Sequence, residues 1–256
     1  MVDVKPGCEP WSTPGSGPNN DIGVLVLHGF TGSPASMRPL AEDIAARGYA
    51  VELPLLPGHG THWKQLQTTT WQDLARETVR AFEQLRARTR VQVVVGLSNG
   101  GLVALRLAQT RGEDLTGMVL INPFLFSLDP RMKVLPILKS VLPSVPGVIN
   151  DIAKPDMDEV GYDRVPLRSL YSMSQLQRQV RAALPDTTVP TLLFTSRQDH
   201  IVDPKNSEEI AERIGAADFD HVWLERSYHV ATLDYDYPEI LEETLKFIER
   251  IAASPA

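Results

Sequence analysis

The sequence predicts an α/β protein with a mainly parallel sheet that helices cover on both faces. Short apolar runs alternate with segments of helical periodicity along most of the chain, as expected of strands joined by crossover helices. The runs at 22–27 and 91–97 are almost entirely apolar, which is typical of strands buried on both faces. The segment Gly96-Leu97-Ser98-Asn99-Gly100 places a serine between the end of one such strand and the start of a helix.

Composition limits the classes of protein to which the chain can belong. Its 256 residues fit one large α/β domain or a domain with an inserted subdomain. A formal net charge of −7, without a lysine or arginine cluster, argues against a surface for nucleic acid. Cys8 is the only cysteine, so we expect neither an internal disulfide nor a cysteine-based metal site. No feature indicates an obligate protein partner.

No segment indicates export or membrane insertion. Residues 1–7 lack the apolar core of a signal peptide, and no apolar run is long enough to span a bilayer. These features predict a cytoplasmic protein, although an exported protein without disulfides fits the same composition.

In the first half of the chain, strands and helices alternate after a polar start. Residues 1–20 are rich in Pro, Gly, Ser and Asn and are expected to lie along the surface. Thr70 is the predicted N-cap of a long helix. The predicted elements are strand 22–27, a helix ending near 47, strand 49–54, helix 71–88, strand 91–97, a helix after Ser98, and strand 117–121.

The alternation is interrupted in the second half. Residues 124–186 contain many prolines, no convincing buried strand, and helical patterns only at 133–141 and 169–184. Strands at 191–195 and 219–224 and helices at 204–214 and 238–252 then complete the pattern. We therefore expect a core made of residues 1–123 and 187–256, with residues 124–186 inserted as a cap over the carboxyl edge of the sheet.

Ser98 is the candidate nucleophile. A strand, the pattern Gly-x-Ser-x-Gly and a helix, in this order, are the setting of a nucleophile elbow. Glycines leave room beside a serine on so sharp a turn, and the start of the helix favours negative charge there. The alternative, a serine that only caps the helix, stays open on this motif alone.

A serine hydroxyl needs a base to become a nucleophile at neutral pH, and the base needs an acid that orients it. In this architecture the three follow one another as serine, acid and histidine. His229 lies in the loop after the last predicted strand and is the candidate base. The other histidines precede Ser98, adjoin the acid candidate or begin a strand; they are His28, His59, His62, His200 and His221.

Two aspartates compete for the role of the acid. Asp199 and Asp203 both follow the predicted strand 191–195. Capping of the helix that starts at Pro204 explains Asp203, whereas Asp199 has no structural role that the sequence reveals. We therefore favour Asp199, with Asp203 as the alternative.

The tetrahedral intermediate of acyl transfer needs two donors aimed at its oxyanion. One is the backbone N–H of the residue after the nucleophile, Asn99. The other is expected from the turn after the first long strand, where Phe30 follows His28-Gly29. An ordinary turn between strand and helix is the alternative explanation of this glycine-rich segment.

With these residues in place, the chain resembles the α/β-hydrolase superfamily and, more narrowly, bacterial monoacylglycerol lipases and their carboxylesterase relatives. The resemblance extends over most of the chain. The matching stretches are His28-Gly29-Phe30-Thr31-Gly32, residues 36–42, Gly58-His59-Gly60-Thr61-His62, the segment around Ser98, and residues 227–236. The fold it implies is an α/β-hydrolase fold, a mainly parallel sheet flanked by helices with a small inserted cap.

The resemblance also implies hydrolysis of monoglycerides with medium to long acyl chains, without a cofactor or a metal. In that family a cap glutamate recognises the glycerol hydroxyls, and residues 156–162 match its setting, which gives this role to Glu159. A solvated surface glutamate is the alternative. Asn99 departs from the family, which usually has an apolar residue such as methionine there, and its side chain is expected to affect substrate preference.

The first half of the expected cap is apolar enough to receive an acyl chain or to touch a lipid aggregate transiently. We expect most of its apolar residues to pack the cap onto the core and a few to contact the acyl chain. These residues are Phe124, Leu125, Phe126, Val134, Leu135, Pro136, Ile137, Leu138, Val141 and Leu142.

Three functions compete on this sequence, and fold alone does not decide among them. The favoured one is a serine hydrolase of monoacylglycerols or similar small lipid esters. A second keeps the same catalytic residues but acts on simple carboxylic esters, on a lactone, or as an acyltransferase. The third is a binding protein without catalysis, which is disfavoured because none of Ser98, Asp199 and His229 is missing.

Overall fold

The structure is a computed structural model that describes residues 3–253. Its strands are β1 (Trp11–Thr13), β2 (Ile22–Leu27), β3 (Ala50–Leu53), β4 (Val91–Leu97), β5 (Gly117–Ile121), β6 (Ser144–Pro146), β7 (Arg164–Pro166), β8 (Thr191–Ser196) and β9 (Phe219–Leu224). Its α-helices are α1 (Arg38–Ala46), α2 (Trp63–Leu66), α3 (Trp71–Arg86), α4 (Asn99–Arg111), α5 (Leu135–Val141), α6 (Leu167–Ala182), α7 (Lys205–Arg213) and α8 (Tyr237–Ala253). Single 3₁₀ turns occur at Gly17–Asn19, Pro34–Ser36, Gly112–Asp114, Pro130–Lys133, Leu184–Asp186 and Ala231–Leu233.

One seven-stranded sheet runs through the molecule in the order β1-β3-β2-β4-β5-β8-β9. Only β1 is antiparallel to its neighbour, and the other pairs are parallel. The strand β4 lies in the middle of the sheet, with Val93 opposite Val24 of β2 and Val95 opposite Val119 of β5. The predicted, mainly parallel sheet is therefore confirmed.

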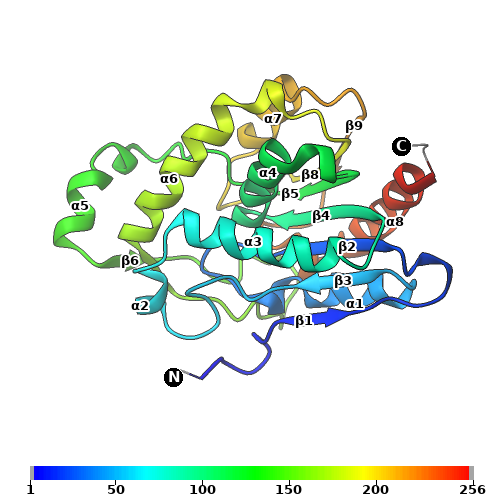
Figure 1. The fold of residues 1–256 in the computed structure, drawn as a ribbon. Helices are drawn as coiled ribbons and strands as arrows, with labels where there is room; N and C mark the ends of the chain where they lie inside the picture. Colours follow the sequence, from blue (N-terminus) through cyan, green and yellow to red (C-terminus); the bar gives the residue numbers. More distant parts are fainter. Residues whose placement is uncertain (1–2, 254–256) are drawn as a thin grey trace.

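Both faces of this sheet are buried. Val26 of β2 lies in an apolar cluster with Ile248 of α8. The next residue, Leu27, points to the opposite face and lies in a second cluster with Phe82 of α3 and Leu102 of α4. In Figure 1, α3 and α4 lie in front of the sheet and α1 lies behind it. Two buried faces explain why the central strands contain almost no polar residues.

Most predicted elements have their expected positions, with ends that differ by a few residues. The strands 22–27, 91–97, 117–121 and 219–224 have the predicted bounds. Thr70 caps α3 as predicted: its hydroxyl accepts the Asp73 N–H, and the Asp73 carboxylate accepts the Thr70 N–H in return. The predicted helix 133–141 is wrong in its first turn, because Pro130–Lys133 is a 3₁₀ turn and α5 begins at Leu135.

The N-terminal segment contains a strand that the sequence did not predict. Trp11–Thr13 pairs antiparallel with β3 as the edge strand β1, and Trp11 packs against the core cluster. Three residues are too few to show the alternation that identifies a strand. Prolines at positions 10 and 14 bound the strand and keep it short, as is common at sheet edges.

The residues between β5 and β8 contain α5, α6 and the antiparallel pair β6–β7. The helix α6 is anchored in the core, since Met173 and Leu176 belong to the cluster that also contains α4. The helix α5 lies at the periphery, beside α6 (Figure 1). The expectation that most apolar residues of this segment pack inward holds for Leu125 and Leu135, which are buried, and is wrong for five others. Those exposed residues are Val134, Pro136, Ile137, Val141 and Leu142.

The peripheral position of α5 explains this exposure, because a helix packed against one neighbouring helix buries only one of its faces. Over residues 3–253, no helix combines the length and the apolar character needed to cross a membrane.

Candidate active site

Ser98 stands on a strained turn between β4 and α4. Its backbone has φ 55° and ψ −116°, a conformation that residues with a side chain rarely adopt. A Cβ atom on Gly96 would come within 2.5 Å of Gly100, and one on Gly100 within 2.3 Å of the Leu27 carbonyl oxygen. Both glycines are therefore needed for this close packing. Strain that the surroundings maintain is characteristic of functional residues.

The structure brings His229 and Asp199 together. The His229 Nδ1 atom lies 2.7 Å from Asp199 Oδ2, and both side chains are almost fully buried. An Nδ1–H that donates to Asp199 leaves His229 Nε2 as a proton acceptor. Among the described residues, no hydrogen bond joins Ser98 Oγ to His229, a contact that is often long before substrate binds.

Asp199 has a structural role that the sequence did not reveal. Its Oδ1 atom accepts the backbone N–H groups of Ile201 and Val202, at 2.8 and 2.7 Å, while Oδ2 faces His229. These bonds hold the carboxylate in place. Asp203 accepts the Lys205 N–H at 2.9 Å, so it binds the first N–H of α7 as predicted, although Pro204 and not Asp203 is the N-cap residue of this helix.

The charges around His229 determine its proton affinity. Burial alone lowers the pKa of this imidazole, because the charged form loses hydration. The charge and hydrogen bond of Asp199, followed by the charges of Glu159 and Asp151, overcome that effect and raise the pKa of His229 above its usual value.

The loop after β2 lies against Ser98. A Cβ atom on Gly29 would meet Ser98 Cβ at 3.3 Å and Ser98 Oγ at 3.8 Å, so a side chain at this position would be in tight contact with Ser98. Phe30 follows Gly29, and its N–H has no acceptor within the described residues. Asn99 is the first residue of α4, so its N–H has no partner inside the helix. Within the described part of the chain, both predicted oxyanion donors are thus free of hydrogen bonds.

The Asn99 side chain is buried without partners. The residue is 1% exposed, and neither Nδ2 nor Oδ1 has a hydrogen bond within residues 3–253. The expectation that this amide borders the substrate pocket remains untested, whereas its burial is clear.

Two further histidines brace the loop that carries Phe30. His28 donates from Nδ1 to the Gly29 carbonyl at 3.0 Å and accepts the Leu56 N–H on Nε2 at 3.2 Å. His59 lies edge-on to it, with ring centroids 4.9 Å apart. Burial and the neighbouring His59 hold the pKa of His28 well below its usual value, and burial lowers the pKa of His59 to about 4. Both rings are therefore neutral near pH 7, and their role is to hold the loop in place.

Glu159 reaches the same loop from the segment between β6 and β7. Its Oε1 atom accepts the Asn150 N–H at 2.8 Å, and its own N–H donates to Asn150 Oδ1 at 2.9 Å. Its Oε2 atom lies 3.5 Å from the position that a Cβ on Gly32 would take, and it has no hydrogen bond among the described residues. Burial raises the pKa of this carboxyl. One carboxylate oxygen therefore stays available beside Gly32, and the charge of this carboxylate acts on His229.

Sequence reasoning missed three residues that hold the His229 loop. Asn122, directly after β5, donates from Nδ2 to the His229 carbonyl at 2.8 Å. Asp234 accepts the Tyr228 N–H at 2.9 Å and also binds backbone N–H groups at positions 153 and 154. Asp151 accepts the His229 N–H at 3.1 Å. Only Asp234 had a sequence signal, because it belongs to the last stretch of the family resemblance.

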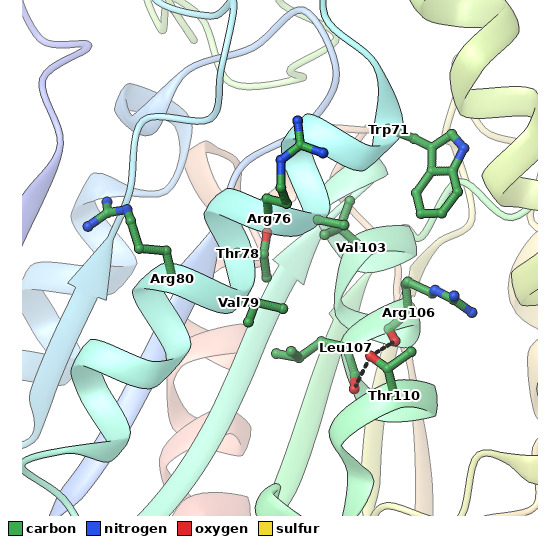
Figure 2. Close-up of a pocket in the computed structure, with 10 residues that line it drawn as sticks. Trp71, Arg76, Thr78, Val79, Arg80, Val103, Arg106, Leu107 and Thr110 are labelled. Atoms are coloured by element: carbon green, nitrogen blue, oxygen red, sulfur yellow. Dashed lines mark hydrogen bonds between the residues drawn. The ribbon is translucent and has the colours of Figure 1, made fainter.

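A groove of about 500 Å³ opens elsewhere, between α3 and α4. Figure 2 shows Val79 on one side of it and Val103 and Leu107 on the other. None of the residues that line it is a predicted site residue, so its size alone does not identify the active site. Within residues 3–253, no cluster of three His, Cys, Asp or Glu side chains is arranged to hold a metal ion.

Comparison with known proteins identifies the family. Residues 18–236 match the hydrolase family described as serine aminopeptidase, S33. The chain is 39% identical to the thermostable monoacylglycerol lipase of Bacillus sp. (strain H-257), over 97% of both chains. It is 27% identical to a carboxylesterase of Bacillus subtilis (strain 168), over 90% of this chain and 94% of that relative.

A solved structure of a metagenome-derived lipolytic enzyme matches 97% of this chain and all of that one, with a TM-score of 0.92 and 38% identity. The predicted resemblance to lipases and carboxylesterases is confirmed by these relatives. The chain therefore belongs to the serine aminopeptidase S33 family of hydrolases and has the α/β-hydrolase fold.

Proposed function

We propose that the chain hydrolyses monoacylglycerols through an acyl-enzyme on Ser98. The observation that carries the proposal is the arrangement of Ser98 on its strained elbow, beside the Phe30 loop, together with the buried pair of His229 and Asp199. Similarity over 97% of the chain to a protein named monoacylglycerol lipase supports this substrate class. No cofactor enters the proposed reaction.

In the proposed first half-reaction, Ser98 Oγ attacks the ester carbonyl carbon while His229 Nε2 takes the hydroxyl proton. Asp199 orients the imidazole and stabilises its charged form. The backbone N–H groups of Phe30 and Asn99 bind the oxyanion. The intermediate collapses as the carbon–oxygen bond to glycerol breaks, and glycerol leaves with the proton from His229.

Water completes the cycle. It attacks the acyl carbonyl carbon of the ester on Ser98 and gives one proton to His229, which returns it to Ser98 Oγ as the fatty acid leaves. The same two N–H groups bind the second oxyanion. Acid, base and oxyanion donors therefore serve both halves of the reaction.

We assign recognition of the glycerol part to Glu159. Its Oε2 atom has no hydrogen-bond partner among the described residues and lies beside the Phe30 loop. A carboxylate accepts hydrogen bonds from the two free hydroxyls of a monoglyceride, and a methyl ester offers none. The position near His229 suits the leaving alcohol, because His229 protonates that alcohol.

Residues 124–186 are the proposed cap, and α5 is its proposed contact with lipid aggregates. Of the nine large apolar side chains that are exposed within the described residues, six lie on this segment. They are Leu128, Val134, Ile137, Val141, Leu142 and Val148. Such a concentration on one short segment is unusual for a surface without a partner. Replacing Ile137 and Val141 by serine is expected to slow hydrolysis of emulsified monoglyceride while leaving a dissolved short-chain ester unaffected.

Covalent labelling tests the nucleophile. A fluorophosphonate probe is expected to modify Ser98 in one-to-one stoichiometry, and Ser98→Ala is expected to abolish both labelling and turnover. Ser174→Ala is the matched control, because that hydroxyl bonds within α6. Stoichiometric labelling of a different serine would reject the assignment.

Paired substrates test the alcohol site. Glu159→Gln keeps an acceptor for the Asn150 N–H but removes the charge, so kcat/KM for a monoglyceride is expected to fall by about tenfold or more. A methyl ester of the same fatty acid is expected to react nearly as before. The comparison is made at alkaline pH, where His229 is neutral in both proteins. A parallel fall for both substrates would remove Glu159 from alcohol recognition and favour a general carboxylesterase.

A further inference from the structure

Asp151 fastens together the two loops that carry Asp199 and His229. Its Oδ2 atom accepts the backbone N–H of His229 at 3.1 Å and that of His200 at 3.2 Å. Its Oδ1 atom lies 2.8 Å from His200 Nδ1, and its backbone carbonyl accepts the Val230 N–H at 3.1 Å. One residue of the segment between β6 and β7 therefore holds the base itself and the residue that follows the acid.

The carboxylate of Asp151 is enclosed by these contacts. Only 10% of its side chain is exposed, and its oxygens are occupied by the two backbone donors and the His200 ring. Buried carboxylates keep such bonds because losing them is costly. Since two donors belong to the main chain, a shift of this carboxylate moves the backbone of His229 and not only a side chain.

The residue before Asp151 holds the carboxylate proposed to bind the alcohol. Asn150 exchanges two hydrogen bonds with Glu159, and its own backbone is left-handed, with φ 57°. Asparagine tolerates that conformation better than most residues. Consecutive residues thus hold Glu159 on one side and the His229 backbone on the other.

We infer that Asp151 is a positioning residue. It holds the His229 backbone in a fixed position relative to the loop that carries Asp199, and it links this position to that of the Glu159 carboxylate. The inference rests on the proposed function, because it assigns Asp151 a part in the same hydrolysis. Asp151 touches no reacting atom and acts through the His229 backbone and through its own negative charge. The segment that carries Glu159 and the loop that carries His229 are then held in one fixed arrangement.

The charge of Asp151 provides a signature that a purely structural residue would lack. The groups whose charges act on His229 are Asp199, Glu159 and Asp151, and each of them raises the pKa of the imidazole against the effect of burial. Hydrolysis needs neutral His229, so its rate falls as the pH drops through this pKa. Removing the charge of Asp151 is expected to move the acid limb of the rate profile to lower pH.

The test measures kcat and kcat/KM for a monoglyceride from about pH 5 to about pH 9. Asp151→Asn is expected to lower the plateau of kcat by between about tenfold and a hundredfold, with a small change in KM, and to shift the acid limb to lower pH. Asp151→Glu keeps the charge on a longer side chain, so the plateau is expected to fall while the acid limb stays in place. Asp163→Asn, an exposed acid of the same segment whose side chain has no hydrogen bond within residues 3–253, is the control and is expected to change neither.

Two results would overturn the inference: a wild-type plateau in Asp151→Asn, or a lowered plateau with an unmoved acid limb. If Asp151→Asn does not fold, Asp151→Glu and His200→Gln decide. Asp151→Glu is expected to lower kcat. His200→Gln keeps the backbone N–H of residue 200 and is expected to leave kcat nearly unchanged. A wild-type kcat in Asp151→Glu would reject the role. Absence of monoglyceride hydrolysis in the wild-type protein would instead reject the proposed function.

Discussion

Buried histidines lie on both sides of the Ser98 site, and their pKa values are shifted in opposite directions. On the side of the Phe30 loop, burial lowers the pKa of His28 and His59, and their nitrogens contact main-chain groups or no group at all. On the other side, Asp199, Glu159 and Asp151 raise the pKa of His229 despite the same burial. Carboxylate neighbours, and not burial, distinguish a general base from a structural imidazole.

This difference gives the two sides opposite responses to acid. His28 and His59 take up protons more readily in the unfolded chain than in the folded protein, so the stability they contribute is lost as the pH falls below about 6.5. His229 binds its proton more tightly in the folded protein, so its contribution is present below about pH 6.5 and is lost as the pH rises through its raised pKa. A fall in pH therefore stops the proposed reaction by protonating His229, and it lowers the stability of the fold through His28 and His59.

Breaking the pair of His229 and Asp199 is expected to have the largest effect. In Asp199→Asn the amide nitrogen faces His229 Nδ1 and favours the wrong tautomer, so kcat is expected to fall by about 10⁴-fold. Asp203→Asn is the matched change in the same loop and is expected to cost only stability, about 0.3–1 kcal/mol, because the amide oxygen still accepts the Lys205 N–H and only the negative charge at the start of α7 is lost. A larger loss of kcat in Asp203→Asn than in Asp199→Asn would show that the acid is assigned wrongly.

Replacing His59, a neutral and buried histidine on the side of the Phe30 loop, tests the other half of this comparison. The pKa of His59 is lowered to about 4. The free energy of unfolding is therefore expected to fall by about 3 kcal/mol as the pH falls from about 6.5 to about 4, because the unfolded chain takes up this proton first. His59→Gln keeps a donor for the main chain but does not titrate, so the decline of stability over this range should flatten. Urea unfolding at a series of pH values measures the effect, with the exposed His62→Gln as control. An unchanged slope would mean that His59 does not resist protonation.

The smallest expected effect concerns Asn99, whose buried side chain has no hydrogen-bond partner within residues 3–253. An unpaired buried polar group costs about 1–3 kcal/mol, so replacing the Asn99 amide in Asn99→Met is expected to stabilise the protein by about that amount. Backbone donation by residue 99 is unchanged, so kcat should remain within a few-fold. Asn206→Met is the control and is expected to destabilise, since that amide accepts the Phe126 N–H and donates to the Asp203 carbonyl. A lower urea midpoint for Asn99→Met would contradict the unpaired state of the amide.

The succession of strands along the chain, the elbow and the contact of His229 with Asp199 were open to prediction because they depend on local patterns and on chain order. The fully apolar run of β4 leads directly to Ser98, and the loops after β8 and β9 must meet at one edge of a parallel sheet. Asp199 was preferred for lacking a structural role, yet it binds two N–H groups of its own loop. That part of the reasoning was wrong, although the preferred residue does contact His229.

The supporting residues could not be predicted, because they act over long separations in sequence. Asp151 and Asn122 bind the backbone of His229 from 78 and 107 residues away, and their neighbours in sequence form no recognisable motif. The exposure of α5 was missed for a related reason, since an apolar pattern does not distinguish a side chain packed on a neighbour from one left on the surface.

Titration of the individual histidines tests the central claim most directly. The ring proton and carbon signals of His28, His59 and His229 are followed by NMR from about pH 4 to pH 9, assigned with one substitution at each position. The account predicts that His229 titrates above about pH 6.5, that His59 titrates near pH 4, and that only the His229 midpoint falls in Asp199→Asn. A His229 midpoint below about pH 6.5, or one that Asp199→Asn leaves unchanged, would contradict it.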